Sequence, residues 1–445
     1  MDQYLESVLN NVKAKNPAEP EFQQAMHDFL ISISPALPKH PQYAENEIIE
    51  RLIEPERFAM FRVPWADDRN KAHINRGFLV QFSSALGTYA GGLRFHPAVD
   101  LGLVKFLAFK QLFRNALTTL PLGAAAGGAD FDPKGKSESE IRRFCHSFMT
   151  ELYNYLMSEK NILWGEIGVG EREISYLSEQ YKKLSISSGG SPAGQCLVSL
   201  QKLTCAQASG YGVAFFIREM LATLNDSFKD KRVAITGSGN LALKTAEKVN
   251  QLGGKVITLS DSRGYIIDAA GLNADKLAFI AGLKSSNSAG LSRYVSKFPE
   301  SEYHEGSGLH NISADIAILC ATQHELNKTD ANALIKKGYI CVAEGAHSAA
   351  TREAVAALLD AGVIYGPGKA AAIGGAALCG LSEEISNLRL APDEIENRLA
   401  EIMKAIYGIC RETSMAYGFP KNYLLGADIA SFLRIADAML TRERT

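Results

Sequence analysis

The sequence predicts an α/β protein in which an α+β domain is followed by a parallel sheet wound with helices and by long C-terminal helices that return to the first domain. Two observations lead to this fold class. The 445 residues suffice for two or three domains of roughly 150 residues each. Near residue 230 the pattern changes to short apolar strands, and helices alternate with them, as in a parallel sheet. We expect domain boundaries at 1–205, 206–375 and 376–445.

The first domain begins with two amphipathic helices, because apolar residues recur at helical spacing over 5–12 and 22–33. The β-rich runs 58–65 and 78–82 flank the turn-forming sequence DDRNKAHINRG, a pattern that predicts a hairpin or two neighbouring strands. Ser137 and Glu140 have the spacing of a capping box, which indicates the start of a further helix.

Short apolar runs predict the strands of the second domain. They are RVAIT (232–236), KVITLS (255–260), DIAILC (315–320), YICVAEG (339–345) and VIYGPG (363–368). Helical spacing over 241–252, 331–337 and 351–359 places helices between these strands, so the sheet should be parallel. Two more helices are expected over 395–409 and 429–436.

Composition excludes several classes of protein. Lys and Arg number 47 and Asp and Glu number 49, so a net charge of −2 provides no field that attracts nucleic acid or anionic lipid. The apolar runs are far shorter than the roughly 20 residues of a membrane span, and the acidic N-terminal segment is unlike a signal peptide. The seven cysteines form no C-x-x-C pair and the nine histidines are scattered, so we expect a cytoplasmic protein without a metal.

A glycine-rich loop follows the first strand of the second domain and leads directly into a helix. This loop contains Gly237, Ser238, Gly239, Asn240 and Leu241. Its glycines allow a tight turn and close approach of a pyrophosphate, which the free N–H groups of the helix N-terminus would bind. The strand–loop–helix context predicts a Rossmann-type dinucleotide-binding domain.

The end of the second strand carries residues that bear on the choice of dinucleotide. Asp261 occupies the position of an acid that binds the ribose, and its carboxylate favours the free 2′-hydroxyl of NAD. Ser262 and Arg263 follow it, and a hydroxyl with a guanidinium suits the 2′-phosphate of NADP. The two indications conflict, and we favour NADP(H) over NAD(H).

From YAGGLRFHP (89–97) onward, the chain resembles the hexameric glutamate dehydrogenases of the NADP-type, bacterial group. The shared motifs, in the order and spacing of that family, include FRNALTTLPLG, GGADFDPKGKS, IGVG, ASGYG, GSGN, SDSRG, CATQ, AEGA, GPGKAA and GADIASFLRIADAML. The resemblance implies a hexamer of two-domain subunits with a substrate cleft between the domains. It leaves open a hetero-oligomer with an intact paralogue.

Several catalytic positions depart from the family pattern. The resemblance places the catalytic lysine at Ala126 and the catalytic aspartate at Glu166. The lysine and the serine that bind the side-chain carboxylate of glutamate correspond to Ala90 and Cys379. We therefore expect that recognition of the second carboxylate is lost and that the chain does not turn over glutamate.

Other positions of the substrate pocket are retained or replaced by residues that can still contact a substrate. Gln111 is retained, and a lysine that binds the α-carboxylate corresponds to Arg114, which can hold one carboxylate with two hydrogen bonds. Trp164, two residues before Glu166, offers an aromatic face to a more apolar substrate. With a carboxyl group at Glu166 and cations lost at 90 and 126, the pocket should accept a cationic iminium.

On the cofactor side, the resemblance implies further contacts. The threonine of the family's ATGYG motif is Ser209, and the asparagine of its AEGAN motif is His347. The CATQ motif contributes Ala321 and Thr322, and Lys134 in DPKGKS is within the expected reach of a 2′-phosphate.

Three functions remain open. The leading hypothesis is an NADP-dependent oxidoreductase that reduces an imine, or oxidises an amine, of a substrate other than glutamate. This reaction needs hydride and a proton, and it needs neither polarisation of a carbonyl nor attack by water. The alternative is an inactive pseudoenzyme or regulatory subunit that keeps the hexameric fold. A non-redox enzyme that uses the same cleft is the third.

Overall fold

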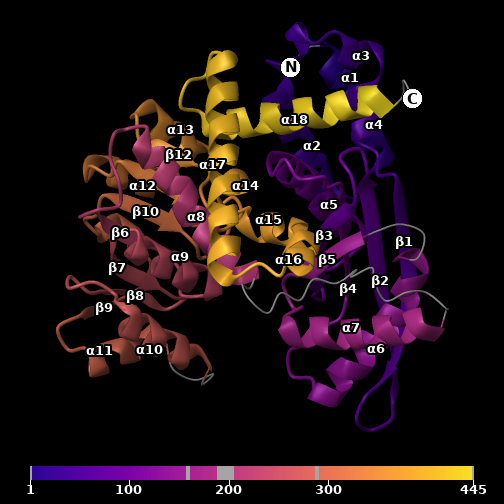
Figure 1. The fold of residues 1–445 in the computed structure, drawn as a ribbon, viewed down its shortest axis with the longest axis horizontal. Coiled ribbons are helices and arrows are strands. Elements are labelled where there is room, and N and C mark those ends of the chain that lie inside the picture. Colours follow the sequence, from indigo (N-terminus) through magenta and orange to yellow (C-terminus); the bar gives the residue numbers. More distant parts are fainter. Residues whose placement is uncertain (1–2, 157–160, 188–204, 286–289, 443–445) are drawn as a thin grey trace. The chain divides into compact units, whose positions relative to one another are not determined.

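A computed structural model describes residues 3–156, 161–187, 205–285 and 290–442 of the chain (Figure 1). Its contacts divide the chain into two units. Unit 1 comprises 1–201, 379–384 and 428–445, and unit 2 comprises 202–378 and 385–427. The C-terminal segment 376–445 is thus shared between the units. Each unit is described below by itself.

Unit 1 contains a mixed five-stranded sheet. Its strands, in spatial order, are β1 (Arg57–Ala66), β2 (Ala72–Ser83), β4 (Ala124–Ala129), β3 (Tyr89–Phe95) and β5 (Asn161–Gly165). β1, β2 and β4 pair antiparallel, and β3 pairs parallel with both β4 and β5. The antiparallel pairing of β1 with β2 confirms the predicted hairpin, but its turn is shorter than expected, because residues 72–77 belong to β2. Of the two strands, β1 forms an edge of the sheet.

Helices cover both faces of this sheet. One face packs against α1 (Gln3–Lys15), α2 (Pro20–Ile33), α5 (Leu101–Leu117) and the part of α18 (Tyr423–Arg442) that belongs to unit 1. The other face packs against α6 (Glu138–Leu156) and α7 (Glu171–Ser187). Two short helices, α3 (Gln42–Glu45) and α4 (Ile48–Leu52), lie between α2 and β1 in the chain. The two N-terminal helices predicted from apolar spacing are confirmed.

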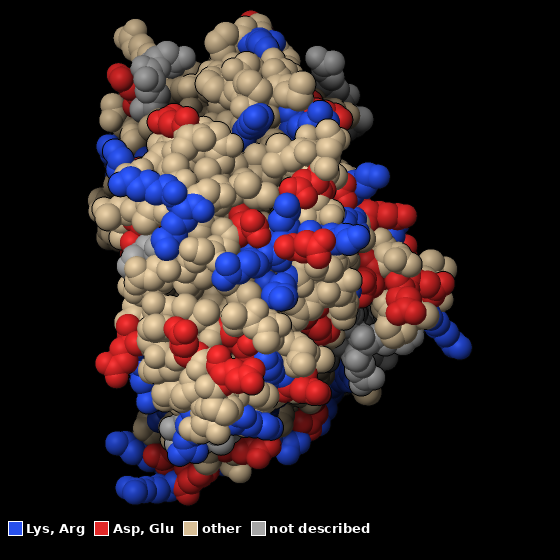
Figure 2. Space-filling view, turned by 90° about the vertical axis from the view of Figure 1, so that its left-hand side faces the viewer, with Lys and Arg blue, Asp and Glu red and all other residues tan. Residues whose placement is uncertain are grey.

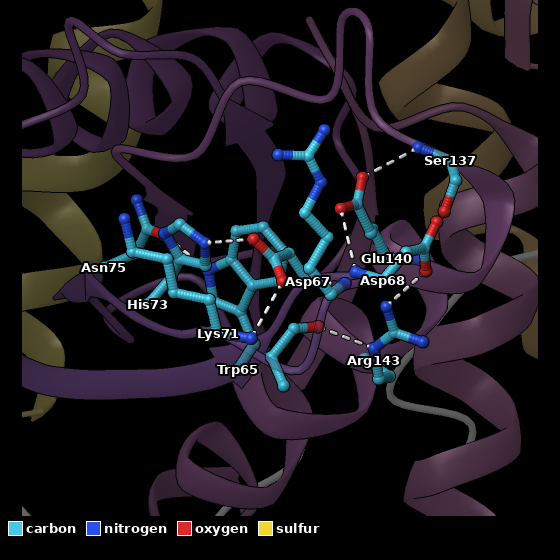
Figure 3. A network of polar contacts seen from close by, with 11 residues as sticks. Trp65, Asp67, Asp68, Lys71, His73, Asn75, Ser137, Glu140 and Arg143 are labelled. Carbon is cyan, nitrogen blue, oxygen red and sulfur yellow. Dashed lines mark hydrogen bonds and ion pairs between the residues drawn. The ribbon is translucent and has the colours of Figure 1, made fainter.

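A polar network joins the turn of the β1–β2 hairpin to the start of α6 (Figure 3). The predicted capping box is present, because the Ser137 backbone N–H donates to Glu140 and the Glu140 N–H donates to the Ser137 hydroxyl. In the turn, Asp67 Oδ2 lies 3.0 Å from His73 Nε2, and the His73 ring stacks on Trp65. Hydrogen bonds from His73 and from backbone N–H groups lower the pKa of Asp67 to about 2.

Unit 2 contains a seven-stranded sheet. The strands, in spatial order, are β12 (Ile364–Gly366), β11 (Cys341–Glu344), β10 (Ile316–Leu319), β6 (Arg232–Ile235), β7 (Lys255–Ser260), β8 (Gly264–Ile267) and β9 (Glu302–Glu305). The strands from β12 to β7 are parallel, as the sequence predicts, and β8 and β9 extend the sheet antiparallel. Sequence periodicity did not predict β8 and β9: β8 follows β7 after a short turn, and β9 is largely exposed and therefore lacks an apolar run.

The helices between and after these strands complete the α/β fold. They are α8 (Cys205–Ala222), α9 (Asn240–Gln251), α10 (Ala274–Ser285), α11 (Tyr294–Lys297), α12 (Lys328–Lys336), α13 (Arg352–Asp360), α14 (Gly368–Ala371), α15 (Gly374–Gly380), α16 (Ser382–Leu388) and α17 (Pro392–Ala416). Of the two long C-terminal helices, α17 packs on α8 within unit 2, whereas α18 contributes Phe432 and Ile435 to the core of unit 1. Only the second of them returns to the first domain, which corrects the expectation for both.

The surface carries charges of both signs. On the face drawn in Figure 2, lysines and arginines are interspersed with acidic residues. Within the part of the chain that the structure describes, none of the helices has the length and apolar character needed to cross a bilayer.

Candidate functional site

The face of the unit 1 sheet that α5 covers collects most of the predicted substrate residues. Leu93 and Leu163 lie in the core beneath α6 and α7. Because side chains alternate along a strand, Ala90 and Gly92 of β3 and Trp164 of β5 point to the opposite face, toward α5. Ala90 and Trp164 are both buried.

The middle of β4 lies on the same face. Ala126 is buried in the core cluster that contains α2 and α5. From α5, Gln111 donates to Asn115 at 2.6 Å, and Asn115 donates to the carbonyls of Ala90 and Gly123. These hydrogen bonds fix α5 over β3, so Gln111 is held next to the position of Ala90.

Glu166 follows β5 and returns its carboxyl group over β3. Its backbone N–H donates to Leu93 at 2.9 Å. A Cβ atom at Gly92 would lie 2.4 Å from the Glu166 carboxyl carbon, so a larger residue there would push this side chain aside. The carboxylate accepts a hydrogen bond from Arg94, with 3.3 Å between Nη2 and Oε2.

Arg114 lies within electrostatic reach of the same carboxylate. Burial lowers the pKa of Arg114, and the negative charge of Glu166 opposes this effect. Two guanidinium groups, those of Arg94 and Arg114, therefore act on one carboxylate. This leaves the α5-covered face with a surplus of one positive charge among these three side chains.

Cys379 is buried and belongs to unit 1. The neighbouring Gly380 packs against Leu120 and Leu122, the segment that leads into β4. The structure thus brings Ala90, Ala126 and the other predicted substrate residues into one unit. The group consists of Ala90, Gln111, Arg114, Ala126, Trp164, Glu166 and Cys379.

The predicted nucleotide loop lies at the carboxyl end of β6, in unit 2. Gly237 has φ of +80°, and a Cβ atom there would lie 2.8 Å from the Cys320 carbonyl oxygen, so this position requires glycine. Gly239 caps the N-terminus of α9, and no described atom lies within 4 Å of the place its Cβ would take. The Leu241 side chain borders Gly345, at the end of β11.

Ser238 adds a further feature to this loop. Its side chain is buried, and its hydroxyl oxygen has no hydrogen-bond partner among the described residues. A buried hydroxyl next to a free helix N-terminus fits an anionic ligand, because a phosphate oxygen could accept both kinds of hydrogen bond. The loop sequence and its geometry are therefore compatible with a dinucleotide pyrophosphate.

The turn after β7 contains the residues Asp261, Ser262 and Arg263, which the sequence analysis assigned to the cofactor. The Ser260 hydroxyl accepts a hydrogen bond from the Gly237 N–H at 2.7 Å, which joins this turn to the glycine-rich loop. Burial raises the pKa of Asp261, but hydrogen bonds from three backbone N–H groups outweigh burial, and the net shift is downward. Ser262 and Arg263 are exposed beside it.

The other predicted cofactor residues lie at the ends of β10 and β11 or on α8. Ala321 and Thr322 are exposed after β10, and His347 is exposed after β11. Ser209 lies on α8 and is partly buried. Lys134 differs from all of these, because it is an exposed residue of unit 1.

Two polar side chains near these loops escaped the sequence analysis. Glu325 accepts a hydrogen bond from the Ala321 N–H at 3.1 Å, and burial raises the pKa of Glu325. Its signal in the sequence is an acid a few residues after a buried strand. Tyr303 on β9 places its hydroxyl against Gly264 of the β7–β8 turn. No sequence signal pointed to it, because β9 was not predicted.

Comparison with known families accounts for both units. Residues 55–183 match the family model "Glu/Leu/Phe/Val dehydrogenase, dimerisation domain", and residues 203–443 match "Glutamate/Leucine/Phenylalanine/Valine dehydrogenase". The chain belongs to the Glu/Leu/Phe/Val dehydrogenase family. Within it, the chain is a glutamate dehydrogenase-like oxidoreductase.

Individual relatives are similar over nearly the whole chain. The NADP-specific glutamate dehydrogenase of Haemophilus influenzae is 44% identical over 441 residues, which cover 98% of both chains. The NAD-specific glutamate dehydrogenase of Bacteroides fragilis is 40% identical, again over 98% of both. The structure of Plasmodium falciparum glutamate dehydrogenase 2 superposes with a TM-score of 0.94 at 41% identity, covering 100% of this chain and 97% of that one.

Proposed function

We propose that this protein is an NADP-dependent oxidoreductase that reduces an imine, or oxidises an amine, of a substrate other than glutamate. The observation that carries the proposal is the face of the unit 1 sheet beneath α5. There, the small side chains of Ala90 and Ala126 lie on the same face as a single carboxylate, Glu166, which two arginines approach.

The residue at position 126 limits the chemistry. Oxidative deamination needs a water molecule activated to attack an iminium, and the reverse reaction needs a polarised carbonyl. A methyl group at Ala126 supplies neither effect. A preformed C=N bond requires only a hydride at carbon and a proton at nitrogen, so its reduction tolerates alanine here. We therefore expect turnover of glutamate to be lower by orders of magnitude than that of an enzyme with a lysine at this position.

The charges on the same face favour a ligand with one carboxylate. Arg114 on α5 and Arg94 on β3 are cations, and Glu166 offsets only one of them. A ligand carboxylate would bind Arg114, and a substrate nitrogen would be held by Glu166 in competition with Arg94. A second carboxylate of the ligand would find no cation to bind at positions 90 and 126, because both are alanines.

The cofactor would be held by residues of unit 2. The pyrophosphate would be bound by the Ser238 hydroxyl and by the N–H groups that begin α9, and Gly239 leaves space in front of them. The nicotinamide would supply or accept the hydride. Arg263 and Ser262 favour a 2′-phosphate, and several relatives are NADP-specific by name.

We further propose that the chain works as a homo-oligomer, with six subunits as the family resemblance implies. The dimerisation-domain description of residues 55–183 supports association through unit 1. Exposed apolar side chains on the β1–β2 hairpin support the same conclusion, since Phe58, Met60 and Ile74 are all more than half exposed. Assembly with an intact paralogue is an alternative that co-purification would reveal.

A second candidate function has support from one observation. Because Arg94 already pairs with Glu166, the only carboxylate of the predicted substrate group is engaged by the protein itself. A pseudoenzyme or regulatory subunit that keeps the fold without redox chemistry would need no free acid there. A non-redox reaction in the same site remains the third candidate.

The test is a titration of the purified protein with NADPH and with NADH, followed by nicotinamide fluorescence. Glutamate, and 2-oxoglutarate with ammonia, serve as turnover controls. Binding of NADPH without glutamate turnover, followed by NADPH oxidation with cyclic imines, supports the proposal. Glutamate turnover at the rate of an ordinary glutamate dehydrogenase overturns it. Absence of binding by both cofactors favours the pseudoenzyme.

A triple variant tests the cause of the altered activity. Ala90→Lys, Ala126→Lys and Glu166→Asp together should recover glutamate turnover, whereas Ala90→Met, Ala126→Met and Glu166→Asp should not, because methionine has similar length and no charge. Equal activity of the two triple variants would refute the assigned role of the two lysines.

A further inference from the structure

The turn between β7 and β8 contains a carboxylate that the protein itself occupies. Asp261 Oδ1 accepts hydrogen bonds from the N–H groups of Arg263, at 2.8 Å, and Gly264, at 3.1 Å. Its Oδ2 accepts from the N–H of Leu291 at 2.9 Å. Both oxygens are thus engaged by backbone donors from two segments of the chain.

These contacts change what Asp261 can do for a cofactor. A carboxylate that binds a ribose uses its oxygens to accept from the sugar hydroxyls. Here backbone N–H groups take three of the roughly four acceptor positions of the carboxylate, and turning it toward a sugar would leave the partly buried N–H groups of Gly264 and Leu291 without an acceptor. The same donors and the nearby Arg263 offset the negative charge of Asp261, so its repulsion of a phosphate is weakened.

Two side chains at this turn, those of Arg263 and Tyr303, suit a phosphate rather than a free ribose hydroxyl. The Arg263 guanidinium and the Asp261 carboxylate both lie beside Gly290, since a Cβ atom there would be 3.5 Å from Arg263 Cζ and 3.3 Å from Asp261 Oδ2. Tyr303 reaches over from β9, and its hydroxyl would lie 2.6 Å from a Cβ atom at Gly264. Gly264 therefore makes room for the Tyr303 hydroxyl, and Gly290 lies in contact with the Arg263 guanidinium.

The Tyr303 hydroxyl belongs to the same electrostatic neighbourhood. Burial raises the pKa of Tyr303, the charges of Asp261 and Glu305 raise it further, and Arg263 opposes them. The phenol is therefore a neutral hydrogen-bond donor near neutral pH. A neutral donor beside a guanidinium suits a phosphate monoester, because its charged oxygens accept hydrogen bonds more strongly than a free hydroxyl does.

We infer that Asp261 organises the β7–β8 turn rather than discriminating between cofactors, and that Tyr303 and Arg263 recognise the 2′-phosphate of the cofactor. This inference rests on the proposed binding of a dinucleotide by unit 2. The inference assigns part of the specificity for NADP to β9, some 40 residues downstream of the β7–β8 turn. Sequence patterns alone did not connect this strand with the turn.

The experiment measures dissociation constants of NADPH and NADH for the wild type, Tyr303→Phe, Arg263→Gln and Asp261→Asn. Because a hydrogen bond to a charged group is lost, Tyr303→Phe and Arg263→Gln should each weaken NADPH binding by about 10-fold to 100-fold. Binding of NADH should change by less than about 3-fold, since it lacks the 2′-phosphate. Arg232→Gln is the matched control for charge, because Arg232 is exposed at the opposite, amino-terminal end of β6.

Asp261→Asn separates the two roles of the carboxylate. An amide group places an N–H donor against at least one backbone N–H, so we expect a lower melting temperature and a similar loss of affinity for both cofactors. A selective loss of NADH binding would instead show that Asp261 binds the ribose hydroxyls of the cofactor, and would overturn the inference.

A nicotinamide-free probe makes failure of this inference distinguishable from failure of the proposed function. Adenosine 2′,5′-bisphosphate should bind more tightly than AMP, and Tyr303→Phe should reduce this difference. If dinucleotides bind but Tyr303→Phe and Arg263→Gln leave the NADPH-to-NADH ratio unchanged, only the inference fails. If the wild type binds neither dinucleotides nor the bisphosphate, the proposed function and the inference fail together.

Discussion

The pairing of Arg94 with Glu166 predicts an energetic coupling that can be measured without knowledge of the substrate. The perturbation is a double-mutant cycle of Arg94→Met, Glu166→Gln and the double variant. Nη2 and Oε2 lie 3.3 Å apart, and the side chains are 20% and 29% exposed. At an effective dielectric constant of about 20, Coulomb attraction at this distance amounts to about 5 kcal/mol before desolvation and screening.

Partial exposure reduces this value considerably. We expect a coupling free energy of about 1–2 kcal/mol, between that of an exposed ion pair and that of a buried hydrogen bond to a charged group. Glu166→Gln should destabilise the protein more than Arg94→Met. It also removes the negative charge that stabilises the buried cation of Arg114.

The assay is thermal unfolding of all variants at one protein concentration, since oligomers melt in a concentration-dependent manner. A coupling of this size corresponds to a non-additive shift of roughly 2–8 °C. Arg76 and Asp130 provide a matched control pair, because their atoms also lie 3.3 Å apart while the Arg76 side chain is 66% exposed. The control cycle should give less than about 0.5 kcal/mol.

Two outcomes would refute this reasoning. Additive effects of Arg94→Met and Glu166→Gln would mean that the ion pair does not form in solution. Persistence of the coupling in a Glu166→Asp background would mean that it does not depend on the longer side chain, whose reach over Gly92 brings the carboxylate to Arg94.

Three further predictions concern the nucleotide loop and the hairpin turn. Gly237→Ala should destabilise the protein by about 2 kcal/mol or more, seen as a lower melting temperature, because φ is +80° and the Cys320 carbonyl blocks a methyl group. Gly239→Ala should leave the melting temperature within about 1 °C and still weaken NADPH binding by about 10-fold, since its methyl group would fill only the space before α9; equal affinity of this variant and the wild type would contradict the assigned phosphate site. Asp67→Asn should lower the melting temperature at pH 5, and this difference should fade between about pH 4 and pH 2, because the folded-state pKa of Asp67, about 2, is below the ordinary value of 3.8 for an aspartate. A difference that grows on acidification would have the wrong sign.

The hydrophobic pattern was sufficient to predict the architecture of both units, because short apolar runs mark the buried parallel strands and apolar residues at helical spacing mark the helices. The parallel strands from β12 to β7 and the helices α1 and α2 agree with the sequence prediction. The pattern failed for β8 and β9, which pair antiparallel at one edge of the sheet, where β9 is largely exposed. It also could not decide with which unit α17 and α18 pack, since an apolar stripe indicates burial without naming the partner.

The sequence by itself determined the chemical identity of the site: alanines at 90 and 126, one acid at 166 and a glycine-rich loop between a strand and a helix. Only the tertiary structure decided how these groups are used, because hydrogen-bond partners are set by packing between distant segments. The same carboxylate can bind a ligand or a neighbouring backbone. Asp261 accepts from the N–H of Leu291, and Glu166 accepts from Arg94, more than 70 residues away. Neither contact follows from local spacing, since each depends on the sheet that brings the two segments together.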